Sequence, residues 1–360
     1  MAKPFVNPFV SGQFLELRVD ALVSDGRGLG RHDGVVVLVE DALPGQLVRA
    51  RVDAVRKSLA EAALVEVLER SPDEQEPPCP HAGRCGGCSW QSLAYGRQLA
   101  WKERIVHDAL ERVGKVACPP MLPILPSPSE WGYRNKMEFS FGDEYKDGPL
   151  SLGLHKKGST YDILNTDDCK LVHPDMTKIL ACVREFFLGL NASFYKKLQH
   201  VGYLRHLLLR RGVTSGEILV HVVTTTQEEY DLEPLKEQLL ALPLEGKIVG
   251  IMHILNDSLS DVVQSDETKI LYGKDYFYEE LLGLKFKIST FSFFQPNSLA
   301  AEILYSKVRE YVGDTRDKVV FDLYSGTGTI AQLAASVASE VIGVEIVEDA
   351  VKAARENAAL

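Results

Sequence analysis

Three cysteines stand close together near residue 80. Cys79, Cys85 and Cys88 form a C-x5-C-x2-C cluster, and three glycines between them give the backbone the freedom to wrap around a metal centre. Thiolates are ligands of both zinc and iron–sulfur clusters. The first gap is longer than that of an ordinary zinc knuckle, but spacing alone leaves both metals open. The alternative is a set of unliganded structural thiols.

A tetrahedral thiolate site needs a fourth ligand, and three further cysteines are available, Cys118, Cys169 and Cys182. Cys169 lies in the polar, turn-like segment NTDDCKL, whereas Cys182 lies among the apolar residues of a helical stretch. We therefore expect Cys169 to complete the site.

A second group of residues has the spacing of a nucleotide-binding turn. Tyr324, Gly326 and Gly328 follow an apolar run that ends in Asp322, and Glu345 ends the next apolar run. Glycines let a ligand approach the turn, and a later carboxylate can accept hydrogen bonds from a ribose. The pattern also fits NAD, but the acid at the first strand's end and the lack of a basic residue among the glycines favour an adenosyl ligand. An ordinary strand-to-helix turn is the structural alternative.

A third motif, Phe294-Gln295-Pro296-Asn297, precedes the helix that leads into this turn. The amide of Gln295 or Asn297 could contact a bound ligand. Alone the motif is weak, because an asparagine before a helix is more often an N-cap.

Composition limits the classes of protein to consider. The chain has 360 residues, of which 45% are hydrophobic and 25% charged, and no apolar run is long enough to span a membrane. Six cysteines are too few for a disulfide scaffold and the first residues do not resemble a signal peptide, so we expect reduced cysteines and a cytosolic protein.

Charge is unevenly distributed. The net charge of −10 argues against indiscriminate polyanion binding, yet residues 146–215 hold eleven Lys or Arg against six Asp or Glu. Candidates for phosphate contacts there are Lys156, Lys157, Arg205, Arg210 and Arg211, with a solvated surface as the alternative. The run Tyr133, Arg134, Asn135 and Lys136 offers one stacking ring and three polar groups, or else a strand edge.

The elements predict a multidomain α/β protein with four parts. Strand-like runs at 13–19, 35–39, 46–55 and 62–70 indicate a small closed β-barrel at 11–70. Residues 71–118 hold the cysteine segment and a helix over 93–113 that ends at Gly114.

The remaining two parts follow. Residues 119–290 read as a central α+β domain with helices near 174–190 and 231–242. In 291–360, a helix at 298–312 leads to strand, turn, helix, strand and helix, the start of a Rossmann-like sheet. With 34 residues after Gly326, we expect this sheet to be incomplete.

The motifs also follow one another in the order that is found in a known family. Together these motifs resemble the RNA 5-methyluridine methyltransferase family. In chain order they are CPHAGRCGGCSWQ, WGYRNKMEFSFG, the later Cys169, FFQPN, and DLYSGTGTIA with VIGVE. The resemblance is to its 23S rRNA uracil methyltransferases, which carry a TRAM barrel and an iron–sulfur cluster. It implies that residues 11–70 form a TRAM-like, OB-like β-barrel and that the central α+β domain at 119–290 is an RNA-binding domain. It implies a [4Fe-4S] cluster on Cys79, Cys85, Cys88 and Cys169. It also implies S-adenosylmethionine contacts at Gln295, Tyr324 and Glu345, with the Gly326 to Gly328 turn beside the ligand's amino acid part.

The resemblance implies methylation of uracil C5 in structured RNA through a covalent cysteine–uracil intermediate. The family continues through an Asp-Pro-Pro segment, a nucleophilic cysteine and a C-terminal Glu base, whereas this sequence ends at Leu360. We therefore name no catalytic residue and expect a truncated, inactive, monomeric chain with 23S rRNA as its partner. The alternatives are a tRNA uracil methyltransferase, a non-catalytic iron–sulfur RNA-binding fragment, and an NAD-dependent iron–sulfur oxidoreductase.

Overall fold

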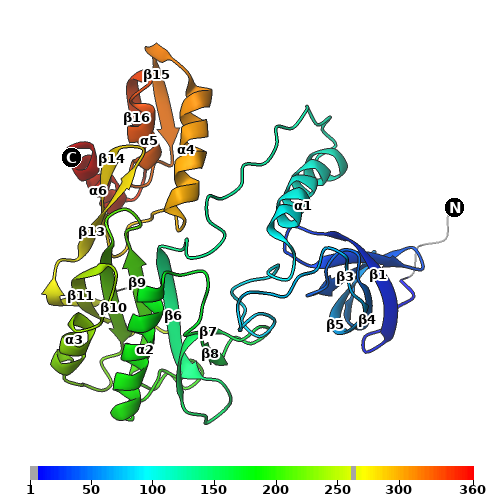
Figure 1. Ribbon diagram of the computed structural model, residues 1–360, viewed down its shortest axis with the longest axis horizontal. Helices are drawn as coiled ribbons and strands as arrows, with labels where there is room; N and C mark the ends of the chain where they lie inside the picture. Colours follow the sequence, from blue (N-terminus) through cyan, green and yellow to red (C-terminus); the bar gives the residue numbers. More distant parts are fainter. Residues whose placement is uncertain (1–6, 261–264) are drawn as a thin grey trace. The chain divides into compact units, whose positions relative to one another are not determined.

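The computed structural model describes residues 7–260 and 265–360, which form two compact units that divide between Pro126 and Ser127 (Figure 1). Each unit is described by itself. No helix in the described ranges is both long and apolar enough to cross a lipid bilayer.

The first unit begins with a closed five-stranded barrel of strand order β1-β2-β3-β5-β4. Along β1, Leu15, Leu17 and Val19 are buried and alternate with exposed residues, as expected for strands that have one face in a core. Closing the sheet leaves no free edge in a unit of this size. The strands are β1 (Phe14–Leu22), β2 (Gly28–His32), β3 (Val35–Glu40), β4 (Leu47–Val55) and β5 (Leu59–Glu69).

Strand β2 differs from the sequence-based expectation, which treated SDGRGLGRHDG as a connection. Glycine has a low strand propensity, so local preference argues against a strand there. Packing explains it: a Cβ on Gly28 would lie 2.7 Å from the Ala42 carbonyl oxygen, and one on Gly30 would overlap the Arg18 carbonyl oxygen. The glycines serve close approach between barrel strands.

The cysteine segment and a helix complete the first unit. The indole of Trp90 donates to the Gly26 carbonyl at 3.0 Å and so ties the segment to the barrel. Helix α1 (Tyr95–Asp108) runs into a π-helical turn (Ala109–Val113) that ends at Gly114, as expected. Trp101 and Ile105 of α1 pack on a buried cluster of barrel and segment residues, Leu22, Leu43 and Leu93.

The second unit is built on a seven-stranded sheet of order β12-β11-β10-β9-β6-β7-β8. Strands β10 and β11 are parallel, and every other neighbouring pair is antiparallel. The strands are β6 (Lys136–Asp143), β7 (Leu150–His155), β8 (Ile163–Asn165), β9 (Leu204–Arg211), β10 (Glu217–Thr224), β11 (Lys247–Leu255) and β12 (Glu267–Gly273).

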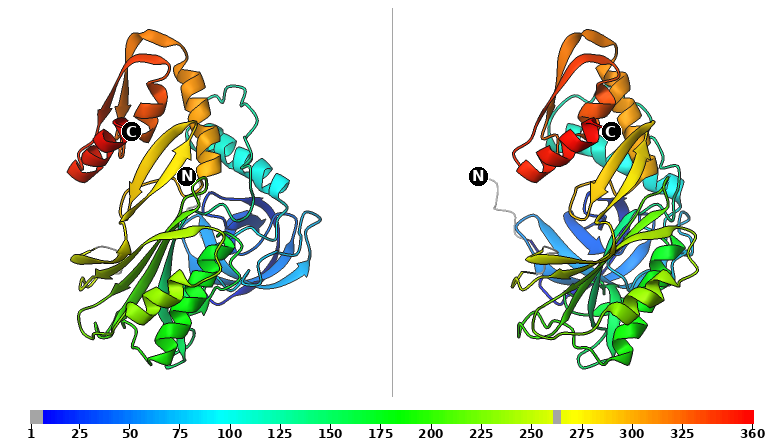
Figure 2. Two further views of the ribbon diagram at one scale, coloured as in Figure 1. Left: turned by 60° about the vertical axis from the view of Figure 1, so that its left-hand side comes forward. Right: turned by 90° about the vertical axis from the view of Figure 1, so that its left-hand side faces the viewer.

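Two helices cover one face of this sheet, α2 (Pro174–Gly189) and α3 (Glu233–Leu240) (Figures 1 and 2). Met176, Ile179 and Val183 recur at helical spacing on α2 and are completely buried against the sheet. Both helices begin at a Pro-containing turn within the ranges that the sequence predicts.

The opposite face packs on a smaller core that joins the sheet to the C-terminal part. Leu219 of β10 and Met252 of β11 contact a hairpin, β13 (Tyr276–Leu281) and β14 (Leu284–Ser289), and helices α4 (Ser298–Val312) and α5 (Thr329–Ala334). The hairpin was absent from the expectation. Its position fixes the loop that follows it, residues 290–297.

The C-terminal part follows the expected order. Parallel strands β15 (Thr315–Leu323) and β16 (Ala338–Val344) are joined through α5, and α6 (Glu348–Ala358) comes last. Phe321 is 60% exposed and Val344 is 48% exposed, although strands of a parallel sheet are normally covered on both faces. The backbone N–H of Lys287 on β14 donates to Asn357 Oδ1 of α6 at 2.7 Å.

Candidate cofactor site

The turn after β15 has the backbone geometry that its glycines predict. Tyr324, Gly326 and Gly328 all have positive φ angles, of 64°, 55° and 75°. Gly328 N donates to the Ser325 carbonyl at 2.8 Å and closes the turn. The Tyr324 side chain is 92% exposed, so its ring is free of packing constraints beside the turn.

Glu345 lies at the end of β16 and faces this turn. Its Oε2 accepts from Gly326 N at 2.9 Å, and its Oε1 accepts from the N–H groups of Ile346 and Val347, both at 2.8 Å. These hydrogen bonds, first that from Val347 and then that from Gly326, lower the pKa of Glu345. The site therefore holds a fixed negative charge.

Gln295 lies near the acidic end of β15. Its side chain hydrogen-bonds the hydroxyl of Tyr305, whose pKa burial raises and the nearby Asp322 raises further. Asp322 Oδ2 accepts from Ala331 N at 2.9 Å at the start of α5, and burial raises the pKa of Asp322. The structure thus brings together the expected residues Gln295, Gly326 and Glu345 around one turn.

The motif that contains Gln295 is held by a residue 160 positions earlier. The Asn135 amide donates to the Gln295 carbonyl at 2.8 Å and to Ser298 Oγ at 2.9 Å. Asn135 N donates to the Pro296 carbonyl at 2.9 Å. Asn135 is 6% exposed, so it is a structural link between β6 and this loop rather than an RNA contact.

Two further residues complete this link and were missed from the sequence. Ser298 Oγ donates to Glu279 Oε2 at 2.9 Å, and Glu279 also accepts from Val213 N at 2.7 Å and Thr214 N at 2.9 Å. Glu279 is 1% exposed. A lone glutamate in YFYEEL gives no local sign of this role, because its partners are far away in the sequence.

Asn297 is an N-cap, the structural alternative that the sequence left open. Its Oδ1 accepts from Ala300 N at 3.0 Å at the start of α4, and its amide donates to Ser127 Oγ at 3.1 Å. Of the two amides in the motif, that of Gln295, which hydrogen-bonds the Tyr305 hydroxyl, is the one left to contact a ligand.

Three of the basic candidates for phosphate contacts are wrong. Arg205 is 3% exposed and donates to the carbonyls of Asn256, Ser258 and Ser260, while Arg210 is 2% exposed and donates to those of Ser289 and Ser292. Arg211 pairs with the buried Asp175 at 3.3 Å. A charge pattern cannot distinguish an arginine that anchors a loop from one that binds phosphate. Lys156 and Lys157 are partly exposed at the end of β7.

The cysteines divide between the two units. Cys79, Cys85 and Cys88 lie in the first, where the Cys79 carbonyl accepts from Ala82 N at 3.1 Å and Cys85 Sγ accepts from Gly87 N at 3.4 Å. Burial raises the pKa of the Cys85 thiol, and the charges of Cys88 and Cys79 raise it further. Cys169 lies in the second unit, in the expected turn, packed against its main core.

The arrangement of the described side chains does not form a metal site. They contain no group of three or more His, Cys, Asp or Glu side chains placed to hold a metal ion. Cys182 lies on α2, where burial raises the pKa of its thiol, which agrees with its interpretation as a helix residue.

Strand, glycine turn, helix and acid-ended strand define the beginning of a doubly wound fold that binds an adenosyl-type cofactor, here joined to a small β-barrel. Comparison with known proteins agrees. Residues 8–65 match the TRAM domain.

Full-length comparison extends the match to nearly the whole chain. It is 46% identical over 349 residues to an uncharacterized RNA methyltransferase of Caldanaerobacter subterraneus subsp. tengcongensis, covering 97% of this chain and 77% of that protein. It is 48% identical over 333 residues to one from Clostridium acetobutylicum, covering 92% of this chain and 73% of the relative. The chain belongs to this family of RNA methyltransferases.

A solved structure shares the fold as well. The tRNA (uracil-54, C5)-methyltransferase of Pyrococcus abyssi, in complex with S-adenosyl-L-homocysteine, superposes with a TM-score of 0.74 and 27% sequence identity. The superposition covers 95% of this chain and 76% of that one.

Proposed function

We propose that this chain is part of an enzyme that transfers a methyl group from S-adenosylmethionine to uracil C5 in structured RNA. The observation that carries the proposal is the turn at Gly326 and Gly328, with the Glu345 carboxylate fixed against it and Gln295 alongside. Family membership supports methyl transfer to RNA, and the Pyrococcus abyssi enzyme, named for uracil C5, supports the base and the cofactor.

Each residue of the site has a separate task in cofactor binding. Glu345, ionised through its backbone hydrogen bonds, accepts from the ribose hydroxyl groups. The glycines let the backbone approach the amino acid part of the ligand, because a side chain there would fill that space. The exposed ring of Tyr324 and the amide of Gln295 orient the ligand at the two sides of the turn. The cofactor supplies an electrophilic methyl group.

The chemistry at uracil requires activation of C5, which is a poor nucleophile. We propose that a cysteine thiolate adds to C6, so that C5 becomes enolate-like and takes the methyl group as the bond from that group to the sulfonium sulfur breaks and S-adenosylhomocysteine leaves. A base then removes the C5 proton, the C5–C6 double bond re-forms, and the cysteine thiolate is released. Cys169 and Cys182, the cysteines of the second unit, pack on the main sheet core rather than at the Gly326 turn. We infer that the nucleophile and the base are not among these 360 residues, since the match spans 77% of the first relative.

The RNA that we propose as substrate is 23S rRNA, with tRNA as the second candidate. The TRAM barrel adds an RNA-binding surface suited to a large structured RNA, and a flipped base costs least in a loop. The tRNA candidate is favoured by one specific observation. The Pyrococcus abyssi enzyme, which acts on uracil 54 of tRNA, covers 95% of this chain in superposition.

We further propose a [4Fe-4S] cluster held by Cys79, Cys85, Cys88 and Cys169. The three neighbouring cysteines of the first unit fit an iron–sulfur cluster in one respect. Their thiolates would be half-buried and would repel one another, and positively charged iron would offset this unfavourable energy. The cluster would stabilise the fold and shape the RNA surface. We also propose that the protein is a monomer and works in the cytosol, where cysteines stay reduced.

Methyl incorporation from labelled S-adenosylmethionine into 23S rRNA fragments and tRNA transcripts tests the substrate. A protein extended to the full length of its relatives should methylate uridine in one of these two RNAs. When the RNA carries 5-fluorouridine instead, methyl incorporation should be lost and a covalent protein–RNA adduct should form. The 360-residue chain should bind S-adenosylhomocysteine and RNA and form no adduct. Adduct formation by that chain would show that the nucleophile is among its own cysteines.

The cluster has its own test, which is independent of methyl transfer. Cys85→Ser should lose the absorbance near 400 nm and RNA affinity together, whereas the control Cys182→Ser should keep both. A chain without iron that still binds RNA would remove the cluster from the proposal. It would leave the cofactor site untouched.

A further inference from the structure

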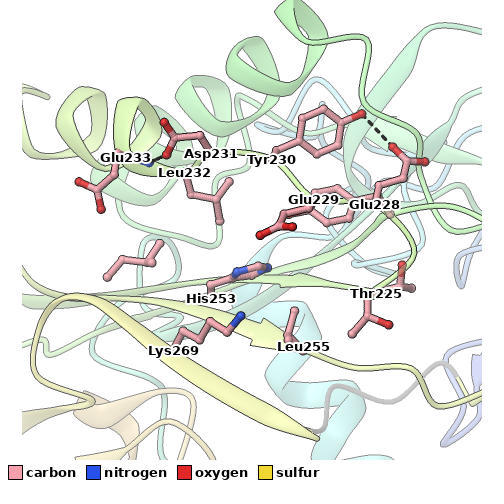
Figure 3. Close-up of a pocket in the computed structure, with 13 residues that line it drawn as sticks. Thr225, Glu228, Glu229, Tyr230, Asp231, Leu232, Glu233, His253, Leu255 and Lys269 are labelled. Carbon is pink, nitrogen blue, oxygen red and sulfur yellow. Dashed lines mark hydrogen bonds between the residues drawn. The ribbon is translucent and has the colours of Figure 1, made fainter.

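A cavity of about 620 Å³ lies on the helix-covered side of the seven-stranded sheet, and the cofactor site does not use it. Its walls come from two directions (Figure 3). The segment 225–233, between β10 and α3, supplies one side, and His253, Leu255 and Lys269 of β11 and β12 supply the other.

Acidic groups dominate the charge of this cavity. A single lysine, Lys269, stands against four carboxylates among the described lining residues, those of Glu228, Glu229, Asp231 and Glu233. His253 stands directly opposite Lys269 in the strand register. Burial, with the charge of Lys269, lowers the pKa of His253, so the imidazole adds no positive charge at neutral pH.

The floor is aromatic. The rings of Tyr203 and Tyr230 have centroids 5.0 Å apart, and those of Tyr203 and His253 are 6.5 Å apart. Glu228 is fixed beside them, since it accepts from Tyr230 OH at 2.8 Å and from Ser193 Oγ. Aromatic faces next to a fixed carboxylate attract organic cations.

A second observation points to a ligand. The Tyr203 side chain is 1% exposed and lines the cavity, yet its hydroxyl makes no hydrogen bond of ordinary geometry, although the Thr224 hydroxyl lies near enough to act on its pKa. The neighbouring Thr224 hydroxyl is engaged by the Thr225 carbonyl at 3.1 Å and by His253 Nε2 at 2.8 Å. A buried hydroxyl without a partner is costly, and a bound N–H donor would satisfy it.

We propose that this cavity binds an aliphatic ammonium cation, with its carbon chain on the Tyr203 and Tyr230 rings and its charge beside Glu228. The volume suits a chain of several methylene groups. A bare metal ion does not fit, because the described part of the chain has no cluster of three His, Cys, Asp or Glu side chains that could ligate one. An anionic ligand would meet four carboxylates.

An aliphatic ammonium group could come from a free polyamine or from the side chain of a lysine on a partner protein. Spermidine and the blocked amino acid N-acetyl-lysine methylamide represent them. The two probes are titrated calorimetrically into the 360-residue chain at low salt, with 1,4-butanediol as the uncharged control. We expect saturable 1:1 binding of at least one ammonium probe and no binding of the diol. Tighter binding of spermidine identifies a polyamine site, and tighter binding of the lysine probe identifies a peptide site.

Variants distinguish this site from general attraction to an acidic chain. Glu228→Gln keeps the shape and removes the charge, so it should weaken binding about tenfold to a hundredfold. Glu237→Gln, an exposed acid of α3 outside the cavity, should leave binding unchanged.

Tyr203→Phe separates binding from folding. Removing an unpartnered buried hydroxyl should leave the melting temperature unchanged or higher, while weakening the ammonium probe about tenfold. The proposal is overturned if neither probe binds. It is equally overturned if Glu228→Gln and Glu237→Gln weaken binding to the same extent.

Discussion

Replacing Asn135 with alanine should detach the loop that carries Gln295 from β6. The side chain makes two hydrogen bonds, to the Gln295 carbonyl at 2.8 Å and to Ser298 Oγ at 2.9 Å. At about 0.5–1.5 kcal/mol for each, their loss should cost about 1–3 kcal/mol of unfolding free energy. The backbone bond from Asn135 N to the Pro296 carbonyl survives in alanine, so the cost belongs to the side chain.

Urea unfolding and calorimetric titration with S-adenosylhomocysteine measure the two consequences. Asn165→Ala is the matched control, because it removes one hydrogen bond, from Leu152 N at 3.0 Å, in the same sheet but away from Gln295. Both variants should shift the unfolding transition of the second unit. Asn135→Ala alone should also weaken cofactor binding.

A double-mutant cycle with Ser298→Ala tests the contact itself. Because Asn135 and Ser298 share a hydrogen bond, their effects on unfolding should differ from additivity by about 0.5–1.5 kcal/mol. Additive effects, or a loss below about 0.5 kcal/mol for Asn135→Ala, would refute the view that this side chain holds the loop.

Three further predictions follow from single sites. Glu345→Gln should weaken S-adenosylhomocysteine about tenfold or more by calorimetry, while Glu340→Gln, exposed on the same strand, should not. Gly28→Ala should lower the melting temperature of the barrel, because its Cβ would lie 2.7 Å from the Ala42 carbonyl oxygen. Burial lowers the pKa of His221 to about 3, so the folded state excludes a proton that the unfolded chain binds below its pKa of 6.5. His221 should therefore make stability fall as pH falls, by about 1.4 kcal/mol between pH 7.5 and 5.5, and His221→Gln should remove that contribution in urea titrations at both pH values. The lowered pKa of His253 leaves part of the slope in place.

Elements with a strong local pattern were predictable from the sequence. Helix α4 occupies the predicted range 298–312, and α2 ends one residue before the predicted end. Strands β7 and β10 coincide with apolar runs. In each case the residues that fix the element are its own, so periodicity suffices.

Elements that depend on distant contacts were missed. Strand β2 forms because a barrel has room for its glycines, and β12 is almost entirely exposed, with no apolar run to reveal it. The β13–β14 hairpin is stabilised by Leu219 and Met252 of the neighbouring sheet. No local pattern records such partners.

The candidate site divides in the same way. The glycine turn and Glu345 are separated by 19 positions and follow a known spacing, so the sequence revealed them. The link through Asn135, Ser298 and Glu279 joins residues 163 positions apart, and it became visible only in the structure.

Arg210 shows why the missed contacts matter for the site. Burial lowers the pKa of Arg210 to about 10, so the guanidinium remains charged at neutral pH in a position that water barely reaches. Burying a charge is costly unless its donors are satisfied, and here the carbonyls of Ser289 and Ser292 accept them. Both carbonyls lie just before Gln295. The central sheet therefore holds both ends of the cofactor loop, through Arg210 on β9 and through Asn135 before β6, so a shift of this sheet on RNA binding would move Gln295 with it.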